Sequence, residues 1–89
     1  MLKINLSKDT VKFLKKLPAK QAKQIAKKIM ELRENPFLND TKKLQGVPYL
    51  RADSGEFRII YFVKQETLHV VLVGKRNDGE VYKKMLRKI

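Results

Sequence analysis

The chain has 89 residues, of which 43% are hydrophobic and none is cysteine. This length suits one domain, residues 1–89, with a modest core, and the composition excludes disulfides, thiolate metal sites and cysteine nucleophiles. Lysine and arginine number 21 against nine acidic residues, a net charge of +12. A surface this basic attracts polyanions, so we expect a nucleic acid, an acidic protein or an anionic membrane surface as partner.

The positive charge is spread along the chain, because residues 1–34 carry +7 and residues 35–89 carry +5. No basic tail therefore accounts for it. No apolar run reaches the length of a membrane span, and the N-terminus lacks the apolar core of a signal peptide. We therefore expect a cytoplasmic protein.

The first element is a strand over residues 2–6, where apolar and polar side chains alternate. Ser7 follows as a helix N-cap, because its hydroxyl can accept a backbone N–H of the first turn. Helical spacing of apolar residues then predicts a first helix whose buried stripe contains Val11, Leu14 and Leu17.

Pro18 ends that helix and suits the first turn of a second one. Asn35 and Pro36 terminate the second helix, since a residue before proline avoids the helical region. The two helices are expected to form an antiparallel hairpin with their eight lysines between positions 8 and 28 facing water. The apolar stripe of the second helix comprises Ala22, Ile25, Ala26, Ile29 and Leu32.

In the second half of the chain, residues 37–48 are expected to form a connection in which Leu44 contacts the core. Three strands are expected to follow it. The predicted strands, separated by polar turns at residues 53–56 and 64–66, cover residues 49–52, 57–63 and 67–73. Gly74 ends the last strand, and residues 81–89 suit a short C-terminal helix. The expected fold class is α+β, in the order β-α-α-β-β-β, with an antiparallel sheet packed against the N-terminal helical hairpin.

The usual catalytic constellations are missing from the sequence. His69 is the single histidine and sits in the middle of a strand, where a packed or surface role is ordinary. Asp53 and Glu56 lie in a predicted turn, where acidic residues are common. There is no phosphate-binding glycine loop and no cluster of metal ligands, so we expect neither a metal nor a cofactor.

Basic and phenolic groups gather at the ends of the predicted strands instead. Alternation along residues 57–63 places Arg58, Ile60 and Phe62 on one face, and Arg51 can project beside Arg58 from the neighbouring strand. Lys75 and Arg76 follow Gly74 beside the same sheet, and Tyr82 comes six residues later. These residues predict either a cationic concavity closed by a phenol or a solvated basic surface.

Four segments together resemble the RelE/ParE superfamily of bacterial and archaeal toxins. They are Leu44-Gln45-Gly46, the run Tyr49-Leu50-Arg51-Ala52-Asp53-Ser54-Gly55-Glu56-Phe57-Arg58-Ile59-Ile60-Tyr61, Val73-Gly74-Lys75-Arg76 and Glu80-Val81-Tyr82. Length and element order extend the similarity to nearly the whole chain. The last two segments are similar to those of the mRNA-cleaving RelE branch.

The resemblance implies an endoribonuclease that cuts the codon exposed in the ribosomal A site, without a metal, by attack of a ribose 2′-OH on its own 3′-phosphate. Arg58 would hold the scissile phosphate, Arg76 would stabilise the developing charge, and Tyr82 would orient the 2′-OH or take part in proton transfer. Arg51 would act as an electrostatic clamp. Contacts to RNA or the ribosome would come from Lys42, Lys43, Tyr49, Lys75 and Lys83.

One departure from the RelE pattern concerns proton removal. The pattern has two lysines on the second predicted strand, where this chain has Tyr49 and Arg51. Arginine is a poor general base because its pKa is very high. Tyr82, Tyr49, the ribosome or water are then the candidates for the base.

The resemblance also implies a small acidic antitoxin as partner, which suits a protein of this charge. An antitoxin helix could cover or displace Val81, Met85 and Ile89 of the C-terminal helix, and operator DNA would be bound only through the antitoxin complex. The alternative is a ParE-like toxin that inhibits DNA gyrase by binding, without catalysis. A basic module for RNA or DNA is a third reading, disfavoured because the sheet is expected to lack paired aromatics for base stacking.

Overall fold

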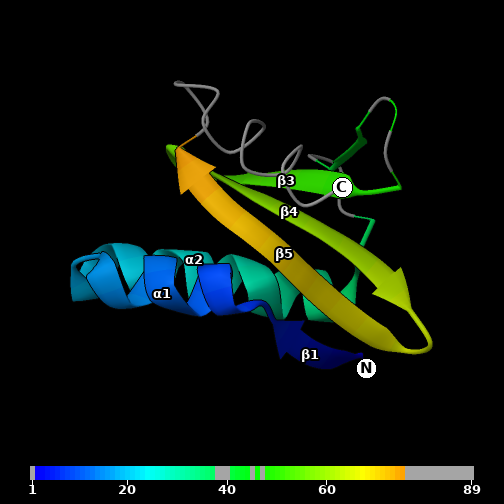
Figure 1. Ribbon diagram of the computed structural model, residues 1–89, viewed down its shortest axis with the longest axis horizontal. Helices are drawn as coiled ribbons and strands as arrows, with labels where there is room; N and C mark the ends of the chain where they lie inside the picture. The colour runs from blue at the N-terminus through cyan, green and yellow to red at the C-terminus, as the bar shows by residue number, and fades with distance from the viewer. Residues whose placement is uncertain (1, 38–40, 45, 47, 76–89) are drawn as a thin grey trace.

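Two helices lie on the same side of a twisted sheet in the computed structural model, which describes residues 2–37, 41–44, 46 and 48–75 (Figure 1). The elements in chain order are β1 (Lys3–Leu6), α1 (Lys8–Lys16), α2 (Ala19–Glu34), β2 (Lys42–Lys43), β3 (Leu50–Ser54), β4 (Phe57–Lys64) and β5 (Thr67–Lys75). The predicted α+β class and the order of a strand, two helices and three long strands are confirmed. The predicted helix over residues 81–89 lies outside the described residues.

The five strands form one sheet in the order β1-β5-β4-β3-β2. Neighbours from β2 to β5 pair antiparallel, whereas β1 pairs parallel with β5. The sequence pattern did not predict this parallel edge, because the pattern of a strand does not state its partner. It also did not predict β2, a two-residue strand within the segment expected to be a connection.

The ends of the helices agree with the capping signals. Ser7 Oγ accepts the backbone N–H of Thr10 at 3.1 Å and donates to the carbonyl of Val71 at 2.6 Å. The N-cap therefore also ties α1 to β5. Pro18 is the N-cap of α2, and Asn35 is its C-cap, as the Asn-Pro pair predicts.

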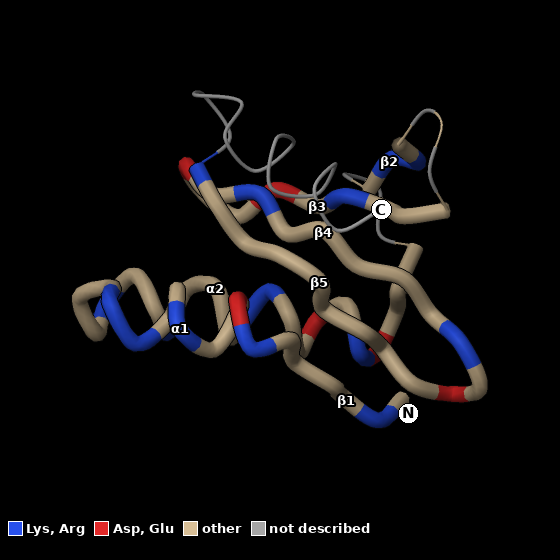
Figure 2. Tube along the Cα trace, viewed as in Figure 1, with Lys and Arg blue, Asp and Glu red and all other residues tan. Residues whose placement is uncertain are grey.

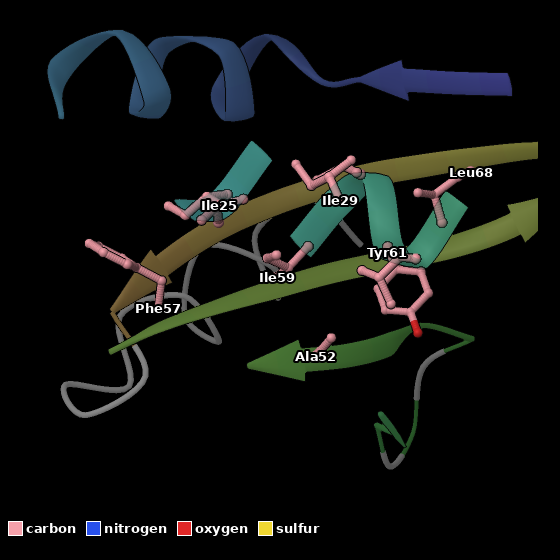
Figure 3. Packing of buried hydrophobic residues seen from close by; sticks show 10 residues of the cluster. Ile25, Ile29, Ala52, Phe57, Ile59, Tyr61 and Leu68 are labelled. Atoms are coloured by element: carbon pink, nitrogen blue, oxygen red, sulfur yellow. The ribbon is translucent and has the colours of Figure 1, made fainter. Parts of the chain in front are cut away.

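The main core lies between the helices and the sheet (Figure 3). Phe13 of α1 meets Phe57 of β4 edge to face, with ring centroids 5.9 Å apart. Val11, which the sequence pattern placed in the buried stripe, is only half-buried, and Thr10 is the fully buried residue of α1. The core residues from α2 and the sheet are Ile25, Ile29, Leu32, Ala52, Phe57, Ile59, Tyr61, Leu68, Val70 and Val73.

The helices turn their lysines outward, as predicted. Figure 2 marks the positions of lysine and arginine along the traces of both helices. Of the eight lysines between positions 8 and 28, seven are exposed, and the half-buried Lys28 has its Nζ 4.0 Å from Glu31 Oε2. None of the helices within the described ranges is long and apolar enough to cross a membrane.

The hairpin between β3 and β4 is tighter than expected. Its loop is Gly55 and Glu56, and Gly55 has φ 59°, which glycine adopts readily. Asp53 and Ser54, predicted to lie in the turn, belong to β3, where they pair with Arg58 and Phe57. Ser54 Oγ also donates to the carbonyl of Gln24 at 3.4 Å, so α2 supports this end of the strand.

The hairpin between β4 and β5 places two ordinary residues in the left-handed region. Gln65 and Glu66 have φ of 51° and 63°, the pattern of a type I′ turn, which normally favours Asn-Gly. We expect Glu66→Gly to raise the free energy of unfolding by about 0.5–1 kcal/mol, since glycine has no Cβ to crowd the backbone there. Urea or thermal unfolding measures this gain.

Glu66→Ala is the matched control, because it removes the same carboxylate but keeps a Cβ at positive φ. The backbone bond from the Lys3 N–H to the Glu66 carbonyl, 2.9 Å, is available to both variants. A gain of equal size in the alanine variant would assign the effect to the lost charge and contradict the backbone explanation.

Candidate functional site

We call the sheet surface turned away from the helices the outer face. Its residues alternate with core residues along each strand: Arg51 and Asp53 on β3, Arg58, Ile60 and Phe62 on β4, His69 and Leu72 on β5. The face predicted for β4 is thus confirmed. An irregularity at Ile60 and Tyr61 leaves Val71 as an extra residue on β5, so that Leu72 lies opposite Ile60.

Two arginines converge on one carboxylate at one end of the outer face. Arg58 lies opposite Asp53 in the β3–β4 register, and its Nε donates to Asp53 Oδ1 at 2.8 Å while Nη2 donates to Oδ2 at 3.4 Å. Arg51 Nη1 lies 3.7 Å from the same Oδ2. We name these residues the Arg–Asp–Arg cluster; their side chains are 15–23% exposed.

The cluster has the chemistry of an anion site. Guanidinium groups present planar forks of N–H donors that match the oxygens of a carboxylate or phosphate, and they stay charged at any physiological pH. Partial burial weakens solvent screening of these charges. The arrangement can hold a phosphate and stabilise negative charge on it, but the two arginines cannot accept a proton from a substrate hydroxyl.

An apolar patch separates this cluster from a row of aromatic rings. Ile60 and Leu72 are buried on the outer face, with Leu44, Tyr49 and Val71 packed against them. The predicted core contact of Leu44 therefore exists, but on the outer face of the sheet. The backbone N–H of Leu44 donates to the Tyr49 carbonyl at 2.9 Å, which continues the pairing of β2 with β3.

The rings of Tyr49, Phe62 and His69 form what we call the aromatic row. The centroids of Tyr49 and Phe62 are 5.6 Å apart with planes at 24°, and those of Phe62 and His69 are 4.6 Å apart at 12°. Asn5 Nδ2 lies 3.0 Å from His69 Nδ1 and supplies the donor. The expectation that the sheet lacks paired aromatics was therefore wrong.

The structure places the other predicted contact residues on both sides of the sheet. Lys42 pairs with Arg51 and belongs to the outer face, whereas Lys43 pairs with Leu50, a core residue. Lys75 lies opposite Phe57, on the helix side rather than beside Arg58. This corrects the expected position of Lys75, and the cause is that β5 continues through Gly74 instead of ending there.

The remaining predicted residues lie outside the described part of the chain. They are Arg76, Tyr82 and Lys83 of the predicted site and Val81, Met85 and Ile89 of the predicted antitoxin surface. Within the residues that are described, no three His, Asp or Glu side chains come together in a way that could hold a metal ion.

Sequence comparison connects this geometry to a family. The chain is 30% identical over 91 residues to the mRNA interferase toxin RelE of Escherichia coli strain K12, an alignment that covers 97% of this chain and 95% of the relative. The chain belongs to the RelE toxin family. A family model described as phage-derived protein Gp49-like also matches, over residues 12–89, so the chain is a member of that family as well.

Solved RelE structures share the fold of this RelE-family chain. A doubly substituted variant of E. coli toxin RelE in the free state has a TM-score of 0.77 and 27% identity, covering 99% of this chain and 97% of that one. The RelE of a RelB–RelE antitoxin–toxin complex from Methanococcus jannaschii gives a TM-score of 0.67 and 30% identity, covering 89% and 95%. The resemblance deduced from the motifs is thereby confirmed.

Sequence reasoning missed two features of the site in this RelE-family chain. Asp53 was assigned to a turn, although its spacing of two from Arg51 is what a shared strand face requires. Phe62 and His69 were not recognised as a pair because they belong to different strands, and only the β4–β5 register brings them opposite each other.

Proposed function

We propose that this protein is the toxin of a type II toxin–antitoxin pair and acts as a ribosome-dependent endoribonuclease. Its substrate is the mRNA codon in the ribosomal A site, and cleavage blocks translation in the cytoplasm. The observation that supports the proposal most is the convergence of Arg51 and Arg58 on one anionic group, in a chain similar along nearly all its length to an mRNA interferase.

The proposed reaction needs only the substrate's own nucleophile. The ribose 2′-oxygen forms a bond to the adjacent 3′-phosphorus, and the bond from phosphorus to the 5′-oxygen of the next nucleotide breaks. The 2′-OH gives up its proton, and the departing 5′-oxygen takes up a proton. Arg58 holds the phosphate through its donor fork. Arg76 neutralises charge as it grows on the phosphorane and the leaving oxygen, and Tyr82 orients the 2′-OH.

Arg51 has the role of an electrostatic clamp, because its guanidinium approaches the same carboxylate, that of Asp53, as the guanidinium of Arg58 does. A second positive charge at this point favours the doubly negative phosphorane over the singly charged phosphodiester. The proton of the 2′-OH goes to the phenolate form of Tyr82 or Tyr49, to a ribosomal group or to water, since neither arginine can take it.

The proposed protein partner is a small acidic antitoxin. The antitoxin–toxin complex to which this chain is similar supports this partner, and so does the net charge of +12. Electrostatic attraction speeds the encounter, so association should slow as salt concentration rises. The proposed contact surface is Val81, Met85 and Ile89, and the pair would bind operator DNA through the antitoxin.

A cell-free translation reaction tests the proposed activity. Purified protein is added to a translated mRNA, and the new 5′ ends are mapped by primer extension beside an Arg76→Ala variant. We expect cuts within A-site codons that require translating ribosomes and disappear in the variant. Intact mRNA with continued translation would reject the interferase and leave gyrase inhibition as the leading alternative; intact mRNA with stalled ribosomes would favour binding without cleavage.

Substitution of Arg51 tests the clamp separately. We expect Arg51→Ala to lower the cleavage rate about 10- to 100-fold, because the charge beside the phosphate is lost. Arg51→Lys should retain cleavage within a few-fold of the original, since it keeps a positive charge at that place. Rates of first-order mRNA cutting on stalled ribosomes measure both. Equal losses in the two variants would show that the fork geometry, and not the charge, is what matters.

A further inference from the structure

We propose that Asp53 is a positioning residue for the reaction, which sets the orientation of the Arg58 guanidinium and holds Arg51 beside it. This inference rests on the proposed function. Asp53 was not among the residues that the sequence or the family resemblance pointed to, and it touches neither the proposed nucleophile nor the phosphate. Its effect would be transmitted through the two arginines.

The geometry of the Asp53–Arg58 pair suits orientation. The two bonds from Nε and Nη2 to the two carboxylate oxygens, 2.8 and 3.4 Å, engage one edge of the guanidinium. A bidentate contact of this kind prevents rotation of the planar group. The contact uses the edge made by Nε and Nη2, and the end edge made by Nη1 and Nη2 is a second fork whose geometry also matches a phosphate. Asp53 and a phosphate therefore address different edges of Arg58.

The position of Asp53 also allows two like charges to stay together. Arg51 lies opposite Ile60, two residues along β4 from Arg58, so the two arginines are diagonal neighbours on the outer face. The two arginine side chains are only 15–20% exposed, so water screens their positive charges poorly. The two charges would repel each other if no anion lay between them. Two arginines and one carboxylate leave the cluster with a net charge of +1, so it still attracts a phosphate.

The backbone at Asp53 is fixed by its neighbours in the sheet and by α2. Asp53 lies directly opposite Arg58 in the antiparallel register, the arrangement in which side chains on the same face approach most closely. The next residue, Ser54, is buried and bonds α2 through the Gln24 carbonyl. The backbone that carries the carboxylate is thereby held in place by both β4 and α2.

The experiment compares Asp53→Asn with Glu56→Gln. Each variant removes one negative charge, which takes the net charge from +12 to +13. Glu56 lies in the turn of the same hairpin, is exposed, and accepts from Gln21 Nε2 at 3.3 Å, a bond that glutamine can also accept. Two quantities are measured: the rate of ribosome-dependent cleavage, and the affinity for a mixed-sequence 2′-O-methyl RNA hexamer, which has no free 2′-OH to attack.

We expect Asp53→Asn to slow cleavage about 10- to 100-fold, as misorientation of a catalytic group does, while it binds the hexamer at least as tightly as the original protein. Glu56→Gln should bind the hexamer as tightly as Asp53→Asn does, and its cleavage rate should stay within about twofold of that of the original protein. An unchanged rate in Asp53→Asn would overturn the proposal. Faster cleavage with tighter binding would show that Asp53 competes with the phosphate for the two arginines. A parallel loss of rate and affinity would show that Asp53 has only a structural role. Either result would contradict the proposal.

A third measurement separates this inference from the proposed function. In ¹H–¹⁵N spectra of the free protein, the Nε–H signal of Arg58 should be resolved and ordered in the original and in Glu56→Gln, and averaged in Asp53→Asn. If the original protein does not cleave mRNA, the proposed function fails, yet this signal still decides whether Asp53 orients Arg58. An ordered signal in Asp53→Asn would contradict the orientation and with it the proposal.

Discussion

Arg58→Ala is expected to lower ribosome-dependent mRNA cleavage by about 100- to 1,000-fold, the loss typical when a donor to the developing oxyanion is removed. The physical reason is that Arg58 offers a planar donor fork on the outer face, oriented by its 2.8 Å bond to Asp53. Single-turnover cutting of mRNA on stalled ribosomes, with products mapped by primer extension, measures the change.

Lys64→Ala is the matched control for Arg58→Ala. Lys64 is the exposed last residue of the same strand, and its loss changes the net charge by the same amount. We expect its cleavage rate within a few-fold of the original, because a distant exposed charge acts only through the screened overall field. Equal rates for the two variants would remove Arg58 from the site. Thermal unfolding of both variants shows whether the loss of the Asp53 partner also weakens the fold.

Phe57→Ala is expected to lower the free energy of unfolding by about 3–5 kcal/mol, the usual cost of truncating a buried phenylalanine. Phe57 is 1% exposed and packs its ring against that of Phe13, so it joins α1 to the strand that bears Arg58. For a domain of this size the melting temperature should fall by about 15 °C or more. Urea unfolding gives the free energy, and calorimetry gives the temperature.

Phe37→Ala removes the same side chain from an exposed place. Phe37 is 68% exposed, and exposed substitutions usually change stability by less than about 0.5 kcal/mol. A comparable loss in both variants would contradict the assignment of Phe57 to the core. Because small domains have only about 5–15 kcal/mol of stability, we also expect the cellular toxicity of Phe57→Ala to fall through reduced abundance of folded protein.

Much of the fold follows from local patterns. The stripe Ile25, Ile29 and Leu32 recurs at helical spacing and is buried against the sheet as that spacing requires. Ser7 caps α1 because a hydroxyl before a helix can satisfy an unpaired N–H whatever the rest of the chain does. Alternation along β4 predicted which side of the sheet Arg58 occupies.

The site was predictable only where one strand or one short hairpin contained all the information. The common face of Arg51 and Arg58 follows from alternation across a short hairpin, and that expectation is confirmed. Lys75 was misplaced because the end of β5 was set at Gly74. Glycine often interrupts a strand, but here the pairing of Arg58 with Gly74 and of Phe57 with Lys75 continues the ladder.

The helices, the long strands, the positive surface and the family of this protein could be predicted from the amino-acid sequence, because periodicity, capping and motifs are properties of neighbouring residues. Three features became visible only in the folded chain: β1 pairs parallel with β5, Asp53 lies between two arginines, and Tyr49, Phe62 and His69 stack. Those features depend on strand order and register. Both are set by which arrangement of the whole sheet buries its apolar face against the helices, and this choice is not encoded in any single segment.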